Sequence, residues 1–156
     1  MNSRGSQFCE DDIPEILRIA EECGLSTWSE SALLDEFESS DSIKQCVRIS
    51  GSLAGFILGR VIPASSLDKG LDAEIFNIGV RTAFRREGVG SFLIDYFINE
   101  CLSRSVYTIW LEVRLQNVGA IEFYKKNGFV DSHRRKAFYS SPPDDALVMR
   151  RDLSVM

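Results

Sequence analysis

The chain has 156 residues, of which 44% are hydrophobic, and its formal net charge is −5 at pH 7. These values are typical of one globular domain, so we expect a single domain over 1–156, with 1–6 as a disordered lead-in. No apolar run approaches the roughly 18 residues of a membrane helix, and the polar start lacks the apolar segment of a secretory signal. An acidic chain does not bind nucleic acid through a bulk electrostatic footprint. We therefore expect a cytoplasmic protein that binds neither membranes nor nucleic acid.

The cysteines and the single histidine argue against a metal site. The cysteines, at positions 9, 23, 46 and 101, show no Cys-x-x-Cys spacing, and reduced thiols are the usual state in the cytosol. His133 has no partner at metal-ligand spacing. We therefore expect no metal, and a structural role for His133.

Two helices are predicted early in the chain. The first opens at Asp11-Asp12-Ile13-Pro14, because aspartate caps helices and proline suits their first turn, and Gly24 ends it. Thr27-x-x-Glu30 has the spacing of a capping box, which predicts a second helix through Phe37.

The rest of the chain alternates strands and helices. Apolar runs bounded by turn residues predict strands at about 46–49, 53–62, 73–80, 107–113, 129–133 and 146–150. Gly51-Ser52 fits a two-residue hairpin turn between the first two. Helices are predicted at 91–102 and 117–127, with Gly128 as a stop signal, and Pro142-Pro143 lie in the last loop. The expected order is βααβββαβαββ, an α/β fold with some parallel pairing.

The turn Arg85-Arg86-Glu87-Gly88-Val89-Gly90 joins a predicted strand to a predicted helix. A glycine turn that opens a helix exposes backbone N–H groups at the positive end of the helix dipole, which suits a phosphate or pyrophosphate. The spacing is neither a Walker A loop nor a full G-x-G-x-x-G fingerprint. A tight turn with glycines for steric reasons is the alternative.

A second cluster lies downstream of this turn and contains Glu112, Asn117, Tyr124 and Gly128-Phe129. With Arg85-x-x-Gly88-x-Gly90, it resembles the GNAT superfamily of acetyl-CoA-dependent N-acetyltransferases. The runs 111–114 and 145–149 narrow the resemblance to the bacterial ribosomal-protein-alanine N-acetyltransferases. The resemblance extends from about residue 72 to the end of the chain.

The resemblance implies a mixed sheet that splays open after the fourth strand, with the pantetheine arm of acetyl-CoA in the gap. The residues it places at the cofactor are Ile78, Gly79, Val80, Arg85, Arg86, Gly88, Val89, Gly90, Ser91 and Asn117. Gly79 or Val80 would donate a backbone N–H to the oxyanion of the tetrahedral intermediate. The arginines can instead be solvated surface, and Asn117 can be a helix N-cap, alone or in addition.

By the same resemblance, Glu112 is the general base and Tyr124 is the general acid that protonates the departing thiolate of coenzyme A. A phenol with a pKa near 10 and a thiol near 8.5 suit this transfer. Glu74 is the rival base, acting through water. From the residues alone, Glu112 can also be a solvated carboxylate at a strand end, and Tyr124 a packing residue.

The implied reaction moves an acetyl group from acetyl-CoA to the N-terminal α-amine of a protein, of the ribosomal-protein-alanine type, by direct attack in a ternary complex. Acetylation of a small amine or a lysine is a second hypothesis. A non-catalytic module that binds coenzyme A is a third, and the presence of both Glu112 and Tyr124 argues against it. A protein N-terminus is the expected partner, and we expect a monomer or weak dimer.

Overall fold

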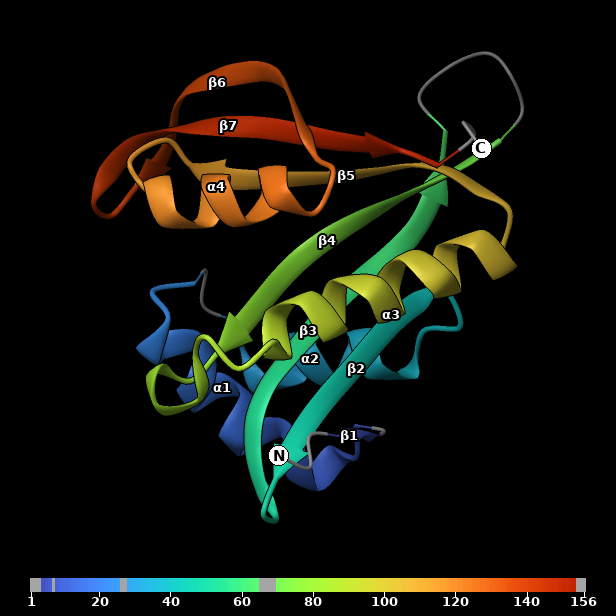
Figure 1. Ribbon diagram of the computed structural model, residues 1–156, viewed down its shortest axis with the longest axis vertical. Coiled ribbons are helices and arrows are strands. Elements are labelled where there is room, and N and C mark those ends of the chain that lie inside the picture. Colours follow the sequence, from blue (N-terminus) through green and yellow to red (C-terminus); the bar gives the residue numbers. More distant parts are fainter. Residues whose placement is uncertain (1–3, 7, 26–27, 65–69, 154–156) are drawn as a thin grey trace. The chain divides into compact units, whose positions relative to one another are not determined.

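The computed structural model describes residues 4–6, 8–25, 28–64 and 70–153. The described strands are β1 (Arg4–Ser6), β2 (Ser42–Ile49), β3 (Ser52–Pro63), β4 (Leu71–Val80), β5 (Val106–Arg114), β6 (Val130–Ser140) and β7 (Pro143–Asp152). The α-helices are α1 (Ile13–Glu22), α2 (Glu30–Glu38), α3 (Val89–Ser103) and α4 (Val118–Lys126), and the short 3-10 helices are η1 (Glu10–Asp12) and η2 (Thr82–Phe84). Apart from the 3-10 helices, the order is βααβββαβαββ, as predicted (Figure 1).

The strands form a mixed sheet in the order β1-β2-β3-β4-β5-β7-β6. β4 and β5 are parallel, whereas β5–β7 and β6–β7 are antiparallel. The β4–β5 register runs from Leu71 opposite Val106 to Ile75 opposite Leu111, so residues 76–80 of β4 lie beyond the last pair. The expected α/β fold with a mixed sheet is confirmed, and its strand order is consistent with the expected splayed sheet.

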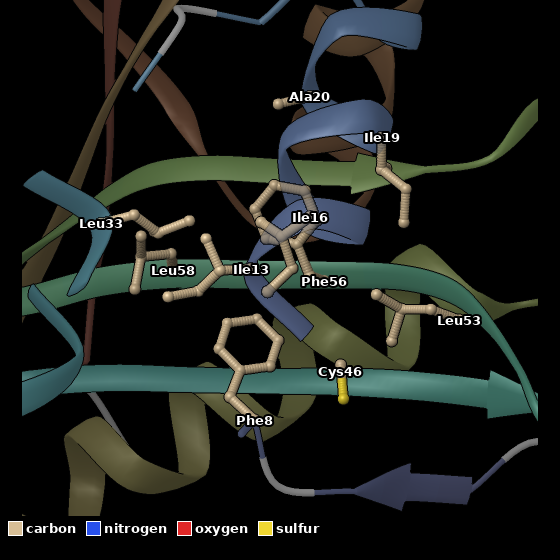
Figure 2. Packing of buried hydrophobic residues seen from close by; sticks show 10 residues of the cluster. All are labelled: Phe8, Ile13, Ile16, Ile19, Ala20, Leu33, Cys46, Leu53, Phe56 and Leu58. Atoms are coloured by element: carbon tan, nitrogen blue, oxygen red, sulfur yellow. The ribbon is translucent and has the colours of Figure 1, made fainter. Parts of the chain in front are cut away.

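The chain divides into two compact units. The first comprises Met1–Val61 and Phe76–Glu100, and its core lies between α1, α2 and the strands beside them. Figure 2 shows apolar side chains of α1 directed at β2 and β3, where they join a buried cluster of Phe8, Ile13, Ile16, Ile19, Ala20, Leu33, Cys46, Leu53, Phe56 and Leu58. The α1 residues recur at helical spacing, so one face of the helix is buried. Each large apolar side chain contributes about 1.5–3 kcal/mol on burial.

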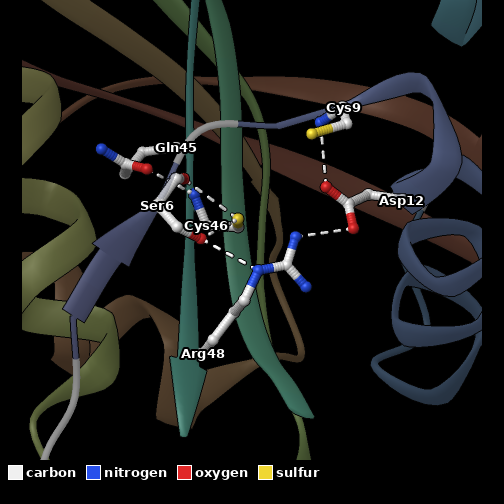
Figure 3. A network of polar contacts seen from close by, with 6 residues as sticks. All are labelled: Ser6, Cys9, Asp12, Gln45, Cys46 and Arg48. Atoms are coloured by element: carbon white, nitrogen blue, oxygen red, sulfur yellow. Dashed lines mark hydrogen bonds and ion pairs between the residues drawn. The ribbon is translucent and has the colours of Figure 1, made fainter. Parts of the chain in front are cut away.

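A polar network fixes β1 and the start of α1 to β2 (Figure 3). The Arg48 guanidinium donates to Asp12 Oδ1 at 2.7 Å and to Ser6 Oγ at 3.1 Å, and Asp12 Oδ2 accepts from the backbone N–H of Cys9 at 2.9 Å. Residues 4–6 were expected to be disordered, and that expectation is wrong for them, because they pair with residues 46–48 of β2. Residues 1–3 lie outside the described part of the chain.

Two glycines allow close approach within the first unit. A Cβ atom on Gly55 of β3 would lie 2.7 Å from the carbonyl oxygen of Gly79 in β4 and 3.1 Å from the Val89 side chain. A Cβ atom on Gly79 would lie 3.1–3.3 Å from Phe56, Leu25 and Ile19. A side chain at Gly55 therefore cannot be added unless backbone moves at the end of β4.

We expect Gly55→Ala to lower the free energy of unfolding by about 1–3 kcal/mol, because the new methyl group meets backbone rather than a flexible side chain. Urea denaturation followed by circular dichroism measures the change. Gly119→Ala is the matched control, since a Cβ there meets nothing within 4 Å. In helix α4 it should leave stability unchanged or raise it by up to about 1 kcal/mol. Equal stability of Gly55→Ala and the wild type would contradict the close approach.

The second unit comprises Ile62–Ile75 and Cys101–Met156. In Figure 1, β7 runs between β5 and β6, with α4 beside these strands. On β5, Ile109, Leu111 and Val113 are buried, and they alternate with the less buried Trp110 and Glu112. Successive residues of a strand point to opposite faces. Trp110 and Glu112 therefore share one face of this unit, away from the buried residues of β5.

Three predicted boundaries in the first unit differ from the structure: the start of α2, the β2–β3 turn and the start of β2. Helix α2 starts at Glu30 and is capped by Ser29, whose Oγ accepts from the Ala32 N–H at 3.1 Å, whereas the sequence predicted Thr27 as the cap. Thr27 lies outside the described residues. The β2–β3 turn is Ser50-Gly51, both with positive φ (52° and 82°), one residue earlier than predicted, and β2 starts earlier, at Ser42. Two positive φ values suit the twist of a two-residue hairpin.

The last two strands are longer than predicted. The sequence ends one strand at 133 and puts Pro142-Pro143 in a long loop, but β6 continues to Ser140 and β7 begins at Pro143. Every β6 residue is exposed except the half-buried Tyr139. The strand therefore has no alternation of apolar and polar residues that sequence inspection can detect. Backbone pairing with β7 holds it instead.

Candidate active site

The predicted phosphate turn lies in the first unit, between β4 and α3. Arg86 has a φ of 66° and Gly88 a φ of 82°, and both residues are exposed. Helix α3 begins directly afterwards, with the Phe92 N–H donating to the Gly88 carbonyl at 3.0 Å. The N–H groups before Phe92 belong to the first turn, where a helix provides no acceptors. An exposed turn followed by N–H groups that have no acceptor within their own helix fits a pyrophosphate.

The two arginines of this turn are placed differently. Arg85 folds back on the end of β4: its Nε donates to the Val80 carbonyl at 3.1 Å, and its Nη2 lies 3.6 Å from Cys23 Sγ. The Cys23 thiol also donates to the Val80 carbonyl, at 3.4 Å, and the Arg81 N–H donates to Ala54 at 2.9 Å. The peptide that ends β4 is therefore held on both sides. Both arginines are exposed, but the side-chain contacts with β4 and Cys23 are those of Arg85.

The second unit contains a pocket of about 330 Å³ on the face that Trp110 and Glu112 share. Its lining residues come from five strands and are Ile62, Pro63, Asp72, Glu74, Trp110, Leu111, Glu112, His133, Arg135 and Val148. The structure thus brings both candidate bases, Glu112 and Glu74, into one pocket. The β4–β5 register explains this, because it puts Glu74 opposite Trp110, two residues before Glu112.

The charges of this pocket are predominantly acidic. Burial raises the pKa of Glu74, the nearby charge of Glu112 raises it further, and Arg135 opposes both. The Arg135 Nη1 donates to Glu112 Oε2 at 3.4 Å. Asp72 is buried and accepts from the Trp110 indole N–H at 2.9 Å. Three carboxyl groups and one arginine leave the pocket suited to a cation such as an ammonium group.

Tyr124 and Asn117 belong to the same unit but do not line this pocket. Tyr124 is buried on α4, and its ring packs edge-on against Phe129 at 5.9 Å between centroids. Burial raises the pKa of Tyr124, and Tyr139 raises it further. The phenol of Tyr124 is therefore protonated at neutral pH and can act as a proton donor. Asn117 is the N-cap of α4, since its Oδ1 accepts from the Ala120 N–H at 3.2 Å.

The end of the β6–β7 hairpin is tied to β5. Arg114 donates to the carbonyls of Pro142 at 2.7 Å and Ser141 at 3.2 Å, and its guanidinium lies 4.2 Å from the centroid of the Tyr139 ring. Burial and the charge of Glu112 raise the pKa of Tyr139.

Sequence reasoning gave no pocket role to Asp72 and Trp110, which line the pocket, whereas it expected Arg134-Arg135, with Phe138 and Tyr139, to border the acceptor side. His133, for which a structural role was expected, is also among the lining residues. A signal existed for β5, since Trp110 is two residues before Glu112 and must share its face. The resemblance places Arg135 on the acceptor side, but its contact with Glu112 could not be predicted, because a bulge in the β6–β7 register lies beside Arg135.

The fold and these sites define an acyltransferase class. The acetyltransferase (GNAT) family model matches residues 13–129, which is most of the chain, and the chain belongs to this family. It is an N-acetyltransferase whose acetyl donor is acetyl-CoA.

Two relatives and two solved structures show which members of the family this chain is similar to. The [ribosomal protein bS18]-alanine N-acetyltransferase of Escherichia coli is 30% identical over 146 residues, 92% of this chain and 93% of the relative. Its counterpart from Haemophilus ducreyi is 28% identical over 143 residues, 90% of this chain and 93% of the relative. The crystal structure of the Escherichia coli ribosomal-protein-S18-alanine N-acetyltransferase has a TM-score of 0.83 at 28% identity, covering 99% of this chain and 96% of that one. Ard1 from Thermoplasma volcanium has a TM-score of 0.84 at 32% identity, covering 96% and 97%.

Two further findings concern the described residues. None of the helices among them is long and apolar enough to cross a membrane. No group of three or more histidine, cysteine, aspartate or glutamate side chains in the described ranges is arranged to hold a metal ion.

Proposed function

We propose that this enzyme acetylates the N-terminal α-amine of a protein, with an alanine-starting ribosomal protein as the first candidate. The observation that carries the proposal is the 30% identity to the bS18-alanine enzyme over 92% of the chain. The acidic pocket supports it, because an α-amine arrives mainly as an ammonium ion at neutral pH. We also propose a cytoplasmic location, one catalytic domain, a monomer or weak dimer, and no binding of nucleic acid.

Each predicted site residue has a proposed task. Residues 78–80, 85, 86, 88–91 and 117 bind the donor: the turn and the N-terminus of α3 hold its pyrophosphate through backbone N–H groups, and Arg86 adds charge. Arg85 holds the end of β4 in place, where Gly79 or Val80 offers an N–H to the oxyanion. When bound, acetyl-CoA supplies a thioester carbonyl that the amine attacks directly.

Glu112 is the proposed general base and Tyr124 the proposed general acid. Glu112 takes a proton from the acceptor nitrogen, and Tyr124 gives its phenolic proton to the departing thiolate. For an α-amine with a pKa near 8, deprotonation at pH 7 costs about 1.4 kcal/mol, so a weak base is sufficient. For a lysine with a pKa near 10.4, the same step costs about 4.6 kcal/mol. A single carboxylate therefore suits the α-amine better than the lysine.

Free-thiol release from acetyl-CoA with two matched peptides tests the proposal. Both peptides start with alanine and contain one internal lysine, and in one of them the α-amine is blocked. We expect turnover only with the free α-amine, and the first residue is then varied to define the preference. Turnover with both peptides would point to lysine. Turnover with neither, although acetyl-CoA binds, would overturn the protein acceptor and favour a small amine.

A further inference from the structure

One cation lies among the carboxyl groups of the acidic pocket, and it comes from the exposed edge strand. Arg135 of β6 pairs with Glu112 of β5 at 3.4 Å, although the register places His133, not Arg135, in line with Glu112 across β7. The register shifts next to Arg135. The guanidinium therefore reaches Glu112 diagonally across the intervening strand.

The position of this guanidinium is fixed from a second side. It lies 4.7 Å from the centroid of the Phe138 ring, a cation–π distance. Arg135 is thus held between an aromatic ring and a carboxylate. The side chain of Arg135 is 53% exposed and that of Glu112 is 22% exposed. An ion pair this exposed adds little to folding stability, so folding alone does not account for it.

Without Arg135, the negative charges of the pocket would have no arginine among the lining residues to offset them. The charged and titratable groups that face Glu74 and Glu112 are Asp72 on β4, His133 and Arg135 on β6, and Tyr139 with Arg114 behind it at the hairpin end. β7 contributes only Val148 to the lining. Asp72 is engaged by Trp110, and Arg114 by Tyr139 and two carbonyls. Arg135 is the arginine of the pocket lining, and it pairs directly with Glu112.

We propose that Arg135 is a positioning residue, which orients the Glu112 carboxylate in the pocket and supplies a counter-charge to the carboxyl groups around it when the acceptor ammonium arrives. This inference rests on the proposed function for its catalytic meaning. The acceptor proton then passes to a carboxylate whose orientation Arg135 has fixed, and Arg135 itself forms no bond with the substrate. Arg135 also lowers the pKa of Glu74 against the effects of burial and of Glu112.

A titration that does not need turnover tests the proposal first. Carbon-13 NMR of the glutamate side chains, assigned with Glu74→Gln and Glu112→Gln, gives the midpoint of Glu74. The sign follows from the counter-charge: Arg135→Gln removes a lowering effect, so the midpoint of Glu74 should move to higher pH. Arg135→Lys should stay close to the wild type. Lys136→Gln removes the same charge from the next residue, which does not line the pocket, and should not move the midpoint.

The same variants are then assayed with the alanine peptide. In Arg135→Gln, the ratio of kcat/KM at pH 8.5 to that at pH 6.0 should rise about threefold or more over the wild type, because Glu74 is protonated more easily without the positive charge of Arg135. Arg135→Met, which keeps an apolar stem, should behave alike. An unmoved Glu74 midpoint in both Gln and Met variants would overturn the positioning role, whatever the turnover. If the wild type acetylates neither peptide, the proposed acceptor fails, while the titration still decides the role of Arg135.

Discussion

Replacing Tyr124 by phenylalanine should lower kcat about 100-fold or more, if proton delivery to the leaving thiolate limits turnover. The ring would remain in its packed position against Phe129, so the fold and the affinity for acetyl-CoA should not change. Only the hydroxyl group is lost. Steady-state kinetics with the alanine peptide, together with the Kd of acetyl-CoA from calorimetry, separates the chemical step from binding.

Tyr107→Phe provides the matched control for this variant. Tyr107 lies on β5 in the same unit, and the residue is 53% exposed. The same hydroxyl is removed there without touching the proposed chemistry, so kcat should equal that of the wild type. A normal kcat in Tyr124→Phe as well would show that Tyr124 is a packing residue of α4.

The pH dependence of the wild type gives an independent reading of Tyr124. A general acid loses activity as pH rises through its own pKa. Burial and Tyr139 raise the pKa of Tyr124 above its ordinary value near 10. No loss of kcat that belongs to this residue should therefore occur below about pH 10. A decline well below that pH that disappears in Tyr124→Phe would contradict the raised pKa.

The order of the elements could be predicted because it depends on local signals. Gly24 and Gly128 have φ values of 67° and 88°, the conformation that helix-ending glycines adopt. β6 could not be extended from sequence, since pairing with a neighbour, rather than its own pattern, makes it a strand. The same reason explains β1: three polar residues become a strand only where β2 offers its edge.

Candidate residues of the site could be named from the sequence, but their arrangement could not be predicted. Resemblance supplied Glu112 and Glu74, and the parallel register then put both into one pocket. Nothing in the sequence distinguishes Arg85 from Arg86, because only the fold shows that Arg85 bonds to the Val80 carbonyl. Arg135 depends on an irregular register and a diagonal contact. Local spacing carries no information about such contacts.

Replacing Glu112 by glutamine should reduce kcat/KM about 100-fold at pH 7, with partial recovery at higher pH. Without a base, only the neutral fraction of the acceptor reacts. For an α-amine with a pKa near 8, that fraction rises from about one tenth at pH 7 to about nine tenths at pH 9. The defect should therefore shrink about tenfold over this range. Glu122→Gln, an exposed residue of α4, is the control and should follow the wild type. A defect that does not change with pH would remove Glu112 from the role of base.

The comparison with Glu74→Gln and the double variant decides which carboxyl group takes the proton. The charge of Glu112 raises the pKa of Glu74, so Glu112→Gln leaves Glu74 a weaker base and unable to compensate. If Glu112 is the base, the double variant should be no slower than Glu112→Gln, and Glu74→Gln should be mildly affected. If Glu74 is the base, Glu74→Gln should be as slow as the double variant, and Glu112→Gln should be only mildly affected. If each single variant is as slow as the double, the glutamates act as a unit, because residues with one shared task show non-additive effects. Glu74 and Glu112 line the same pocket as Arg135, so the effects of the two substitutions are expected to be coupled. If the effect of the double variant on the activation free energy were the simple sum of the two single effects, the glutamates would not be coupled.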